Sequence, residues 1–134
     1  MTFPRPRLAH LAAALILAGT GAAIAGQFPQ SLVPELIGVE REVCKSAVAY
    51  GKRFENYLDI NGDKRVDIVL DYRDTNCYPN PDVFCPSGAS GACLLKAYVA
   101  DKGGWRKVYE GRAKSWSIDP ARSVLIIDGK PLQP

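Results

Sequence analysis

Histidine is almost absent from this sequence. The single histidine, His10, lies within the first 25 residues, which we expect to be removed from the working protein. Without another histidine, the rest of the chain cannot form a Ser-His-Asp or Cys-His catalytic arrangement. The sequence also lacks a P-loop and a dinucleotide-binding motif, because the glycines of residues 87–91 follow neither pattern and are typical of a flexible loop. These absences exclude the commonest nucleophilic and nucleotide-dependent enzymes.

Long hydrophobic runs are confined to the N-terminus. Two arginines within the first seven residues precede an apolar run over residues 8–18, and small residues follow up to residue 25. This order predicts a secretory signal peptide over residues 1–25 and export to the periplasm or the medium. The alternative is an uncleaved membrane anchor, but the run is interrupted at residues 19–21 and is short for a span of about 20 residues. We therefore expect no stable membrane span after cleavage.

Neither sign of charge dominates the chain once residues 1–25 are set aside. Their only charged residues are two arginines, so removing them leaves nearly equal numbers of acidic and basic residues. Nucleic-acid binding depends on a strong positive field, so no nucleic-acid partner is predicted. Acidic residues gather between residues 55 and 82, which favours a cation site in that part of the chain.

Cysteine is sparse but even in number, and the four residues are Cys44, Cys77, Cys85 and Cys93. In a small exported domain an even count predicts two disulfides. A zinc site is the competing interpretation, but the sequence has no Cys-x-x-Cys pair and no histidine after residue 25. Three pairings are possible. The pairing Cys44–Cys77 with Cys85–Cys93 is favoured, because the second pair encloses the short loop of residues 86–91.

One amphipathic helix is expected near the start of the exported chain. Apolar residues recur at steps of three to four positions from Pro34 to about Ala49, which predicts a helix with one apolar face. Pro34 suits its first turn, and Gly51 can end it. Residues 26–33 are expected to form a flexible leader because Pro29 and Pro34 discourage regular structure.

The remaining chain is expected to form short strands joined by turns. β-branched and aromatic residues predict strands over residues 53–58, 66–72, 93–100, 105–109, 112–118 and 124–127. The turn signal at residues 101–104 predicts a hairpin, and Trp105 and Tyr109 should share one face of its second strand because they are four positions apart. Residues 76–91 are expected to form a loop held by covalent links rather than by a core. We therefore predict a single α+β domain over residues 34–134, with the helix packed on a four- to five-stranded antiparallel meander.

A candidate cation site lies between the first two predicted strands. Oxygen-bearing side chains occupy positions 1, 3, 5 and 9 of a nine-residue loop, namely Asp59, Asn61, Asp63 and Asp67. Oxygen ligands at alternate positions of a tight loop can converge on one hard cation, which favours calcium. The alternative is a polar hairpin turn, for which Asn-Gly is an ordinary sequence. An EF-hand is excluded, because position 6 is Lys64 and position 12 is Leu70 where that motif needs Gly and Glu.

The same loop resembles the calcium loop of FG-GAP/VCBS repeats, which have the pattern Asp-x-Asn-Gly-Asp-x-x-x-Asp followed at once by an apolar strand. The resemblance implies that the side chains of Asp59, Asn61, Asp63 and Asp67 bind calcium together with the backbone carbonyl of Arg65. The chain has material for only one such repeat. It also resembles small exported bacterial proteins with one such loop, a helix before the first cysteine and a cysteine-bearing loop after the second strand.

These patterns predict an exported, non-enzymatic domain in which calcium is structural. Such a domain would present a surface to a protein or glycan partner. One alternative is a periplasmic inhibitor of an envelope-active hydrolase that uses the loop between Cys77 and Cys93 as a rigid wedge. A less favoured alternative is a small metal-dependent hydrolase that uses the aspartate cluster for catalysis.

Overall fold

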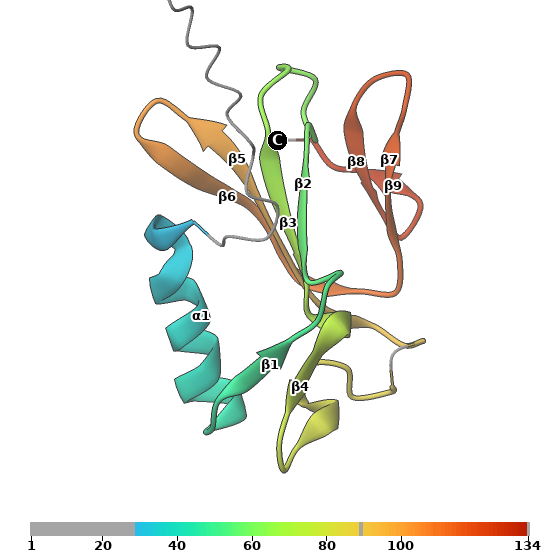
Figure 1. Ribbon diagram of the computed structural model, residues 1–134. Coiled ribbons are helices and arrows are strands. Elements are labelled where there is room, and N and C mark those ends of the chain that lie inside the picture. The colour runs from blue at the N-terminus through green and yellow to red at the C-terminus, as the bar shows by residue number, and fades with distance from the viewer. Residues whose placement is uncertain (1–28, 89, 134) are drawn as a thin grey trace, which may run out of the picture.

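The computed structural model describes residues 29–88 and 90–133, so the predicted signal peptide and residues 26–28 of the predicted leader lie outside the described residues. A four-stranded antiparallel sheet forms the middle layer, in the order β2 (Glu55–Leu58), β3 (Asp67–Asp71), β5 (Cys93–Asp101) and β6 (Gly104–Ala113). A helical segment lies on one side of this sheet, and a small three-stranded sheet lies on the other (Figure 1). The expected α+β class is confirmed.

The helical segment is shorter at its C-terminal end than the sequence pattern predicts. It consists of a 3-10 turn (η1, Gln30–Leu32), an α-helix (α1, Val33–Val39) with Pro34 in its first turn, and a π turn (η2, Glu40–Cys44). It ends at Lys45, whose positive φ of 64° reverses the chain. The predicted extension to Ala49 is wrong, because β1 (Val48–Tyr50) instead pairs with β4 (Thr75–Cys77) in a two-stranded ribbon. No helix in the described part of the chain is long and apolar enough to cross a membrane.

Both faces of the middle sheet are covered. Successive residues of its central strands therefore point alternately into two separate cores. One face packs against the helical segment and the β1–β4 ribbon. This helix-side core contains Leu32, Val39, Cys44, Val48, Phe54, Ile68, Leu70, Tyr72, Cys77, Phe84 and Tyr98. The other face packs against the C-terminal strands, and this C-terminal core contains Ile60, Val69, Leu95, Ala97, Val99, Ala113, Leu125 and Ile127.

A β-bulge in the β5–β6 hairpin changes which face its aromatic residues occupy. The predicted hairpin is present, but its register shifts so that Ala97 pairs with Tyr109 and the next residue, Tyr98, pairs with Lys107. The extra residue, Val108, inverts the alternation along β6. Trp105 therefore packs on the helix-side core and Tyr109 on the C-terminal core, and the prediction that they share one face is wrong.

The single meander sheet is also wrong, because the chain leaves the middle sheet after Ala113. The predicted strand over residues 112–118 divides into the end of β6 and the start of β7 (Trp116–Asp119), which pairs with β8 (Val124–Ile127), and β8 pairs in turn with β9 (Lys130–Pro131). The Asp128 carboxylate accepts hydrogen bonds from the N–H groups of Lys114 (2.8 Å) and Ser115 (2.9 Å). These bonds satisfy the backbone where the strand is interrupted.

Two disulfides secure the segment between β4 and β5. They join Cys44 to Cys77 and Cys85 to Cys93, which is the pairing that the sequence favours. This segment also has its own anchor in the core, because Phe84 is only 1% exposed and its carbonyl accepts the N–H of Leu94. The expectation that covalent links alone hold the loop is therefore wrong.

Candidate metal site

The loop of residues 59–67 joins β2 to β3 at the top of the view in Figure 1, beside the turn between β7 and β8. Two residues with positive φ give the loop its shape, Gly62 at 79° and Lys64 at 66°. A Cβ atom on Gly62 would lie 3.1 Å from the carbonyl oxygen of Arg122. Glycine is therefore favoured at position 62 both by the positive φ and by the close approach of the neighbouring turn.

Three of the predicted ligand residues converge in space. Asp59, Asp63 and Asp67 each offer a carboxylate oxygen, and the three oxygens all lie within 4.8 Å of one another. Asp63 is exposed, Asp59 is half-buried and Asp67 is fully buried. Carboxylate oxygens at this spacing are ligands suited to a hard divalent cation.

Asp67 is the one fully buried carboxylate of the three. Its two oxygens accept hydrogen bonds from the N–H of Ile60 at 3.0 Å and from the N–H of Ala100 at 2.8 Å. Asp67 therefore ties the loop to the end of β5. An ionised carboxylate has about four acceptor positions, so two remain for a cation after these bonds are made.

Asp59 organises the tip of the loop. Its Oδ1 accepts hydrogen bonds from the N–H groups of Asn61 (3.1 Å) and Gly62 (2.7 Å), and its Oδ2 accepts one from Lys64 (2.9 Å). Aspartate commonly bonds the backbone of the residues that follow it, which stabilises a turn without a metal. The bonds of Asp59 are therefore consistent both with a polar turn that holds no metal and with a cation site.

Asp63 is engaged by the neighbouring arginine. The Arg65 guanidinium donates to Asp63 Oδ2 from Nε at 2.9 Å and from Nη2 at 2.8 Å, and the backbone N–H of Arg65 donates to Oδ1 at 2.8 Å. This backbone bond, followed by the guanidinium, holds the pKa of Asp63 below its ordinary value. Because the Arg65 side chain is 53% exposed, it can move into solvent and leave Asp63 to a cation.

The other two predicted ligands lie within the same loop. Asn61 accepts the N–H of Asp63 through Oδ1 at 3.0 Å and donates to Asp63 Oδ2 through its amide nitrogen at 3.1 Å. Arg65 contacts Asp63 through its side chain and its backbone N–H, whereas the sequence resemblance assigns the ligand role to its carbonyl.

The C-terminal strands support the loop from the side. The N–H of Leu125 donates to the carbonyl of Ile60 at 3.1 Å, and Asn61 forms an isolated bridge with Val124. Leu125 is fully buried, so this contact has a fixed position. Sequence reasoning missed both Ala100 and Leu125, because they act through backbone groups on strands far along the chain.

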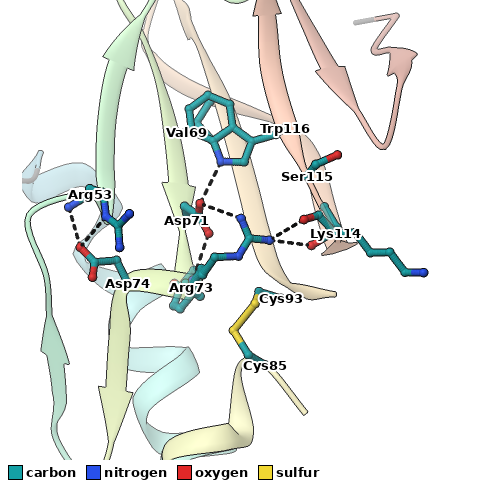
Figure 2. Close-up of polar contacts among 12 residues, drawn as sticks. Arg53, Val69, Asp71, Arg73, Asp74, Cys85, Cys93, Lys114, Ser115 and Trp116 are labelled. Carbon is teal, nitrogen blue, oxygen red and sulfur yellow. Dashed lines mark hydrogen bonds and ion pairs between the residues drawn. A yellow bond between two sulfur atoms is a disulfide. The ribbon is translucent and has the colours of Figure 1, made fainter. Parts of the chain in front are cut away.

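A second polar cluster joins the middle sheet to the C-terminal strands, and sequence reasoning missed it as well. Figure 2 shows Asp71 between Trp116 and Arg73. The Trp116 indole N–H donates to Asp71 at 2.9 Å, and the Arg73 guanidinium, 3.6 Å from the same carboxylate, donates to the carbonyls of Ala113 (3.2 Å) and Lys114 (2.9 Å). The cluster holds the start of β7 where the chain leaves the middle sheet.

The arrangement of the 59–67 loop suits binding of a cation better than acid–base catalysis. Asp67 is fully buried and both its oxygens accept backbone N–H groups, so it is poorly placed to exchange protons with a substrate.

The two disulfides are typical of proteins outside the reducing cytoplasm. No protein-family model, no curated protein and no solved structure matches this chain.

Proposed function

We propose that this protein is an exported, non-enzymatic domain in which one calcium ion binds the 59–67 loop and stabilises the fold. The observation that carries the proposal is the convergence of the Asp59, Asp63 and Asp67 carboxylates within 4.8 Å. Three carboxylates this close repel one another unless positive charge lies among them. Arg65 supplies part of that charge on the exposed side.

Calcium is the cation that the donor set favours. All the candidate ligands are oxygens, and calcium accepts six to eight of them in flexible geometry, whereas magnesium demands a near-ideal octahedron. The spacing that resembles FG-GAP/VCBS loops points the same way. Because Arg65 competes for Asp63, we expect affinity on the order of 10⁻⁴ M, as in extracellular modules.

The proposed role of the ion is structural. Asp67 links the loop to β5, and Ile60 links it to β8, so an ion held by Asp67 would hold three parts of the fold in register. A ligand that binds only the folded state stabilises it by about 2.7 kcal/mol at a concentration one hundred times its Kd. In a periplasmic or extracellular setting, calcium binding would thereby maintain a surface for a protein or glycan partner.

Thermal unfolding of the processed, oxidised protein tests this proposal. We expect 10 mM calcium to raise the Tm above its value in EDTA, with a smaller effect of magnesium. The double variant Asp59→Ala/Asp63→Ala should lose this calcium response. The matched control is Asp82→Ala, an exposed aspartate whose side chain makes no hydrogen bond or ion pair with the described residues, and it should keep the response. An identical Tm for the parent protein in calcium and in EDTA would refute calcium binding.

A second candidate function, inhibition of an envelope-active hydrolase, is favoured by one observation. Tyr78 is 81% exposed, the largest value among the exposed large hydrophobic residues of the described chain. It follows Cys77 in the disulfide-secured segment, and its carbonyl accepts the Ser46 hydroxyl at 2.6 Å. A preorganised loop with an exposed aromatic residue loses little entropy on binding.

The inhibitor candidate is tested by assaying purified peptidoglycan hydrolases and serine proteases with and without the oxidised protein. Inhibition should depend on Tyr78 and disappear in Tyr78→Ala, while the calcium response of the Tm stays unchanged. Full activity of every enzyme at a micromolar excess of the protein would count against this candidate.

A further inference from the structure

A groove separates the helical segment from the end of the β5–β6 hairpin that lies away from its turn. Its volume is about 420 Å³. Pro34, Val39 and Val43 line it from the helical side, and Phe84 and Leu94 line it from the sheet side. The groove shares none of its lining residues with the 59–67 loop, so an inference drawn from it does not depend on calcium binding.

Gly38 leaves this groove open. It lies within α1 and lines the groove, and a Cβ atom built on it would meet no atom of the described residues within 4 Å. Glycine inside a helix costs about 1 kcal/mol relative to alanine. Among the described residues, no neighbouring atom requires a glycine at this position. The helix is therefore less stable with Gly38 than it would be with alanine at this position.

Three charged residues that line the groove, Glu35, Lys96 and Glu110, form ion pairs with one another and with Lys107, which lies outside the groove lining. Lys96 is only 3% exposed, and its ammonium lies 3.0 Å from Glu35 and 3.5 Å from Glu110. Lys107 contacts the same two carboxylates at 3.2 Å and 2.6 Å. Two ammonium groups and two carboxylates balance, so this quartet attaches the helix to the sheet and leaves no net charge for a ligand.

Two further charged residues line the groove without a partner of opposite sign. Arg112 donates only to backbone carbonyls, to Phe84 at 2.7 Å and to Val83 at 3.3 Å, and no carboxylate among the described residues pairs with it. The Glu42 carboxylate makes no hydrogen bond or ion pair with any described residue. An arginine has five N–H donors, so Arg112 keeps donors for a ligand.

We propose that this groove binds a short zwitterionic peptide. The carboxylate of the peptide would bind the Arg112 guanidinium, which favours carboxylates by charge and by its planar fork. Its amino group would bind Glu42, and an apolar side chain would fill the space beside Gly38, against Phe84 and Leu94. The volume is at the lower end of small-molecule sites, which fits a peptide of two or three residues.

Nuclear magnetic resonance titration of the oxidised, ¹⁵N-labelled protein tests the proposal. The probe is the tripeptide Ala-Leu-Ala with both ends charged, compared with its N-acetylated and C-amidated forms. We expect saturable shifts of the backbone amides of Gly38, Phe84 and Leu94, and each capped form should bind about tenfold more weakly because one charged contact is lost. Absence of shifts at 10 mM tripeptide would overturn the proposal, and so would equal affinity of either capped form.

Variants locate the site. Gly38→Leu places a good helix former where its Cβ is clear of other atoms, so the protein should remain folded while the groove is filled and binding is lost. Arg112→Gln should weaken binding about tenfold, whereas Arg106→Gln, an exposed arginine of the same strand, should not change it. If Arg112→Gln does not fold, Gly38→Leu decides alone. Unchanged affinity in Gly38→Leu contradicts the proposal.

Discussion

Replacing Asp67 by alanine should destabilise the protein even when no metal is present. The Asp67 side chain is fully buried, and it is the acceptor for the N–H of Ile60 at 3.0 Å and for that of Ala100 at 2.8 Å. Alanine leaves both donors without a partner. Because the Asp67 side chain is fully buried between the loop and β5, water cannot reach the two donors until the loop loosens.

The magnitude follows from the two donors. A buried N–H without an acceptor costs about 1 to 3 kcal/mol, and because the Ala100 bond is only partly buried, the sum should be about 2 to 4 kcal/mol. Domains of this size have total stabilities of about 5 to 15 kcal/mol. At roughly 4 °C per kcal/mol, the Tm should fall by about 8 to 16 °C.

The assay is unfolding of the oxidised protein in EDTA by urea and by heat, with circular dichroism as the measured signal. Asp67→Asn should be intermediate, because the amide oxygen can accept one N–H while the amide nitrogen faces the other. If Asp67→Ala unfolds within about 0.5 kcal/mol of the parent in EDTA, the carboxylate does not hold the loop.

Three further predictions concern single contacts. Arg65→Gln should tighten calcium binding several-fold by isothermal titration calorimetry, because the guanidinium no longer competes for Asp63; weaker binding would contradict this. Burial alone would raise the pKa of Glu35, but hydrogen bonds from two lysines hold that pKa below its ordinary value. This contribution to stability is present above about pH 4.5 and is lost as the pH falls further, so Glu35→Gln should flatten the acid side of a Tm–pH profile, and an unchanged profile would refute it. Trp116→Phe should lower the free energy of unfolding by about 1 to 2 kcal/mol, because its N–H bond to Asp71 is lost; a neutral effect would show that the bond does not stabilise the fold.

Local patterns located most of the strands of this fold, but they did not locate its layers. The strand before Asp71 and the hairpin around residues 101–104 are each predicted by residues that are neighbours in the sequence, and both are present. The break after Ala113 depends instead on the Asp128 carboxylate, which lies 14 residues beyond Lys114. The alternation of apolar and polar residues does not reveal a hydrogen bond between a carboxylate and a backbone N–H, so one long meander was the natural prediction.

The end of the helix shows the same limit at shorter range. The apolar spacing continues past Lys45, and the next glycine, the usual residue at positive φ, is Gly51. In the structure Lys45 itself adopts a φ of 64°, while Cys44 is joined to Cys77. Pairing of β1 with β4 therefore overrides the helical pattern of residues 47–50.

The candidate site could be predicted to the extent that its residues are close in sequence. The convergence of Asp59, Asp63 and Asp67 is a property of one loop, and their spacing was sufficient to group them. The backbone partners of the loop, Ala100 and Leu125, lie on distant strands and carry apolar side chains that give no polar signal. Their roles follow only from the three-dimensional packing of the strands.

The position of β3 determines how the molecule should come apart. Ile68 and Leu70 belong to one core and Val69 to the other, so a single strand forms a wall of both. Because β3 belongs to both cores, neither core should unfold while the other stays folded. The domain should therefore unfold cooperatively in one step. Trp105 packs against one core and Trp116 against the other, so each indole reports from its own side. Their fluorescence changes should occur at the same denaturant concentration.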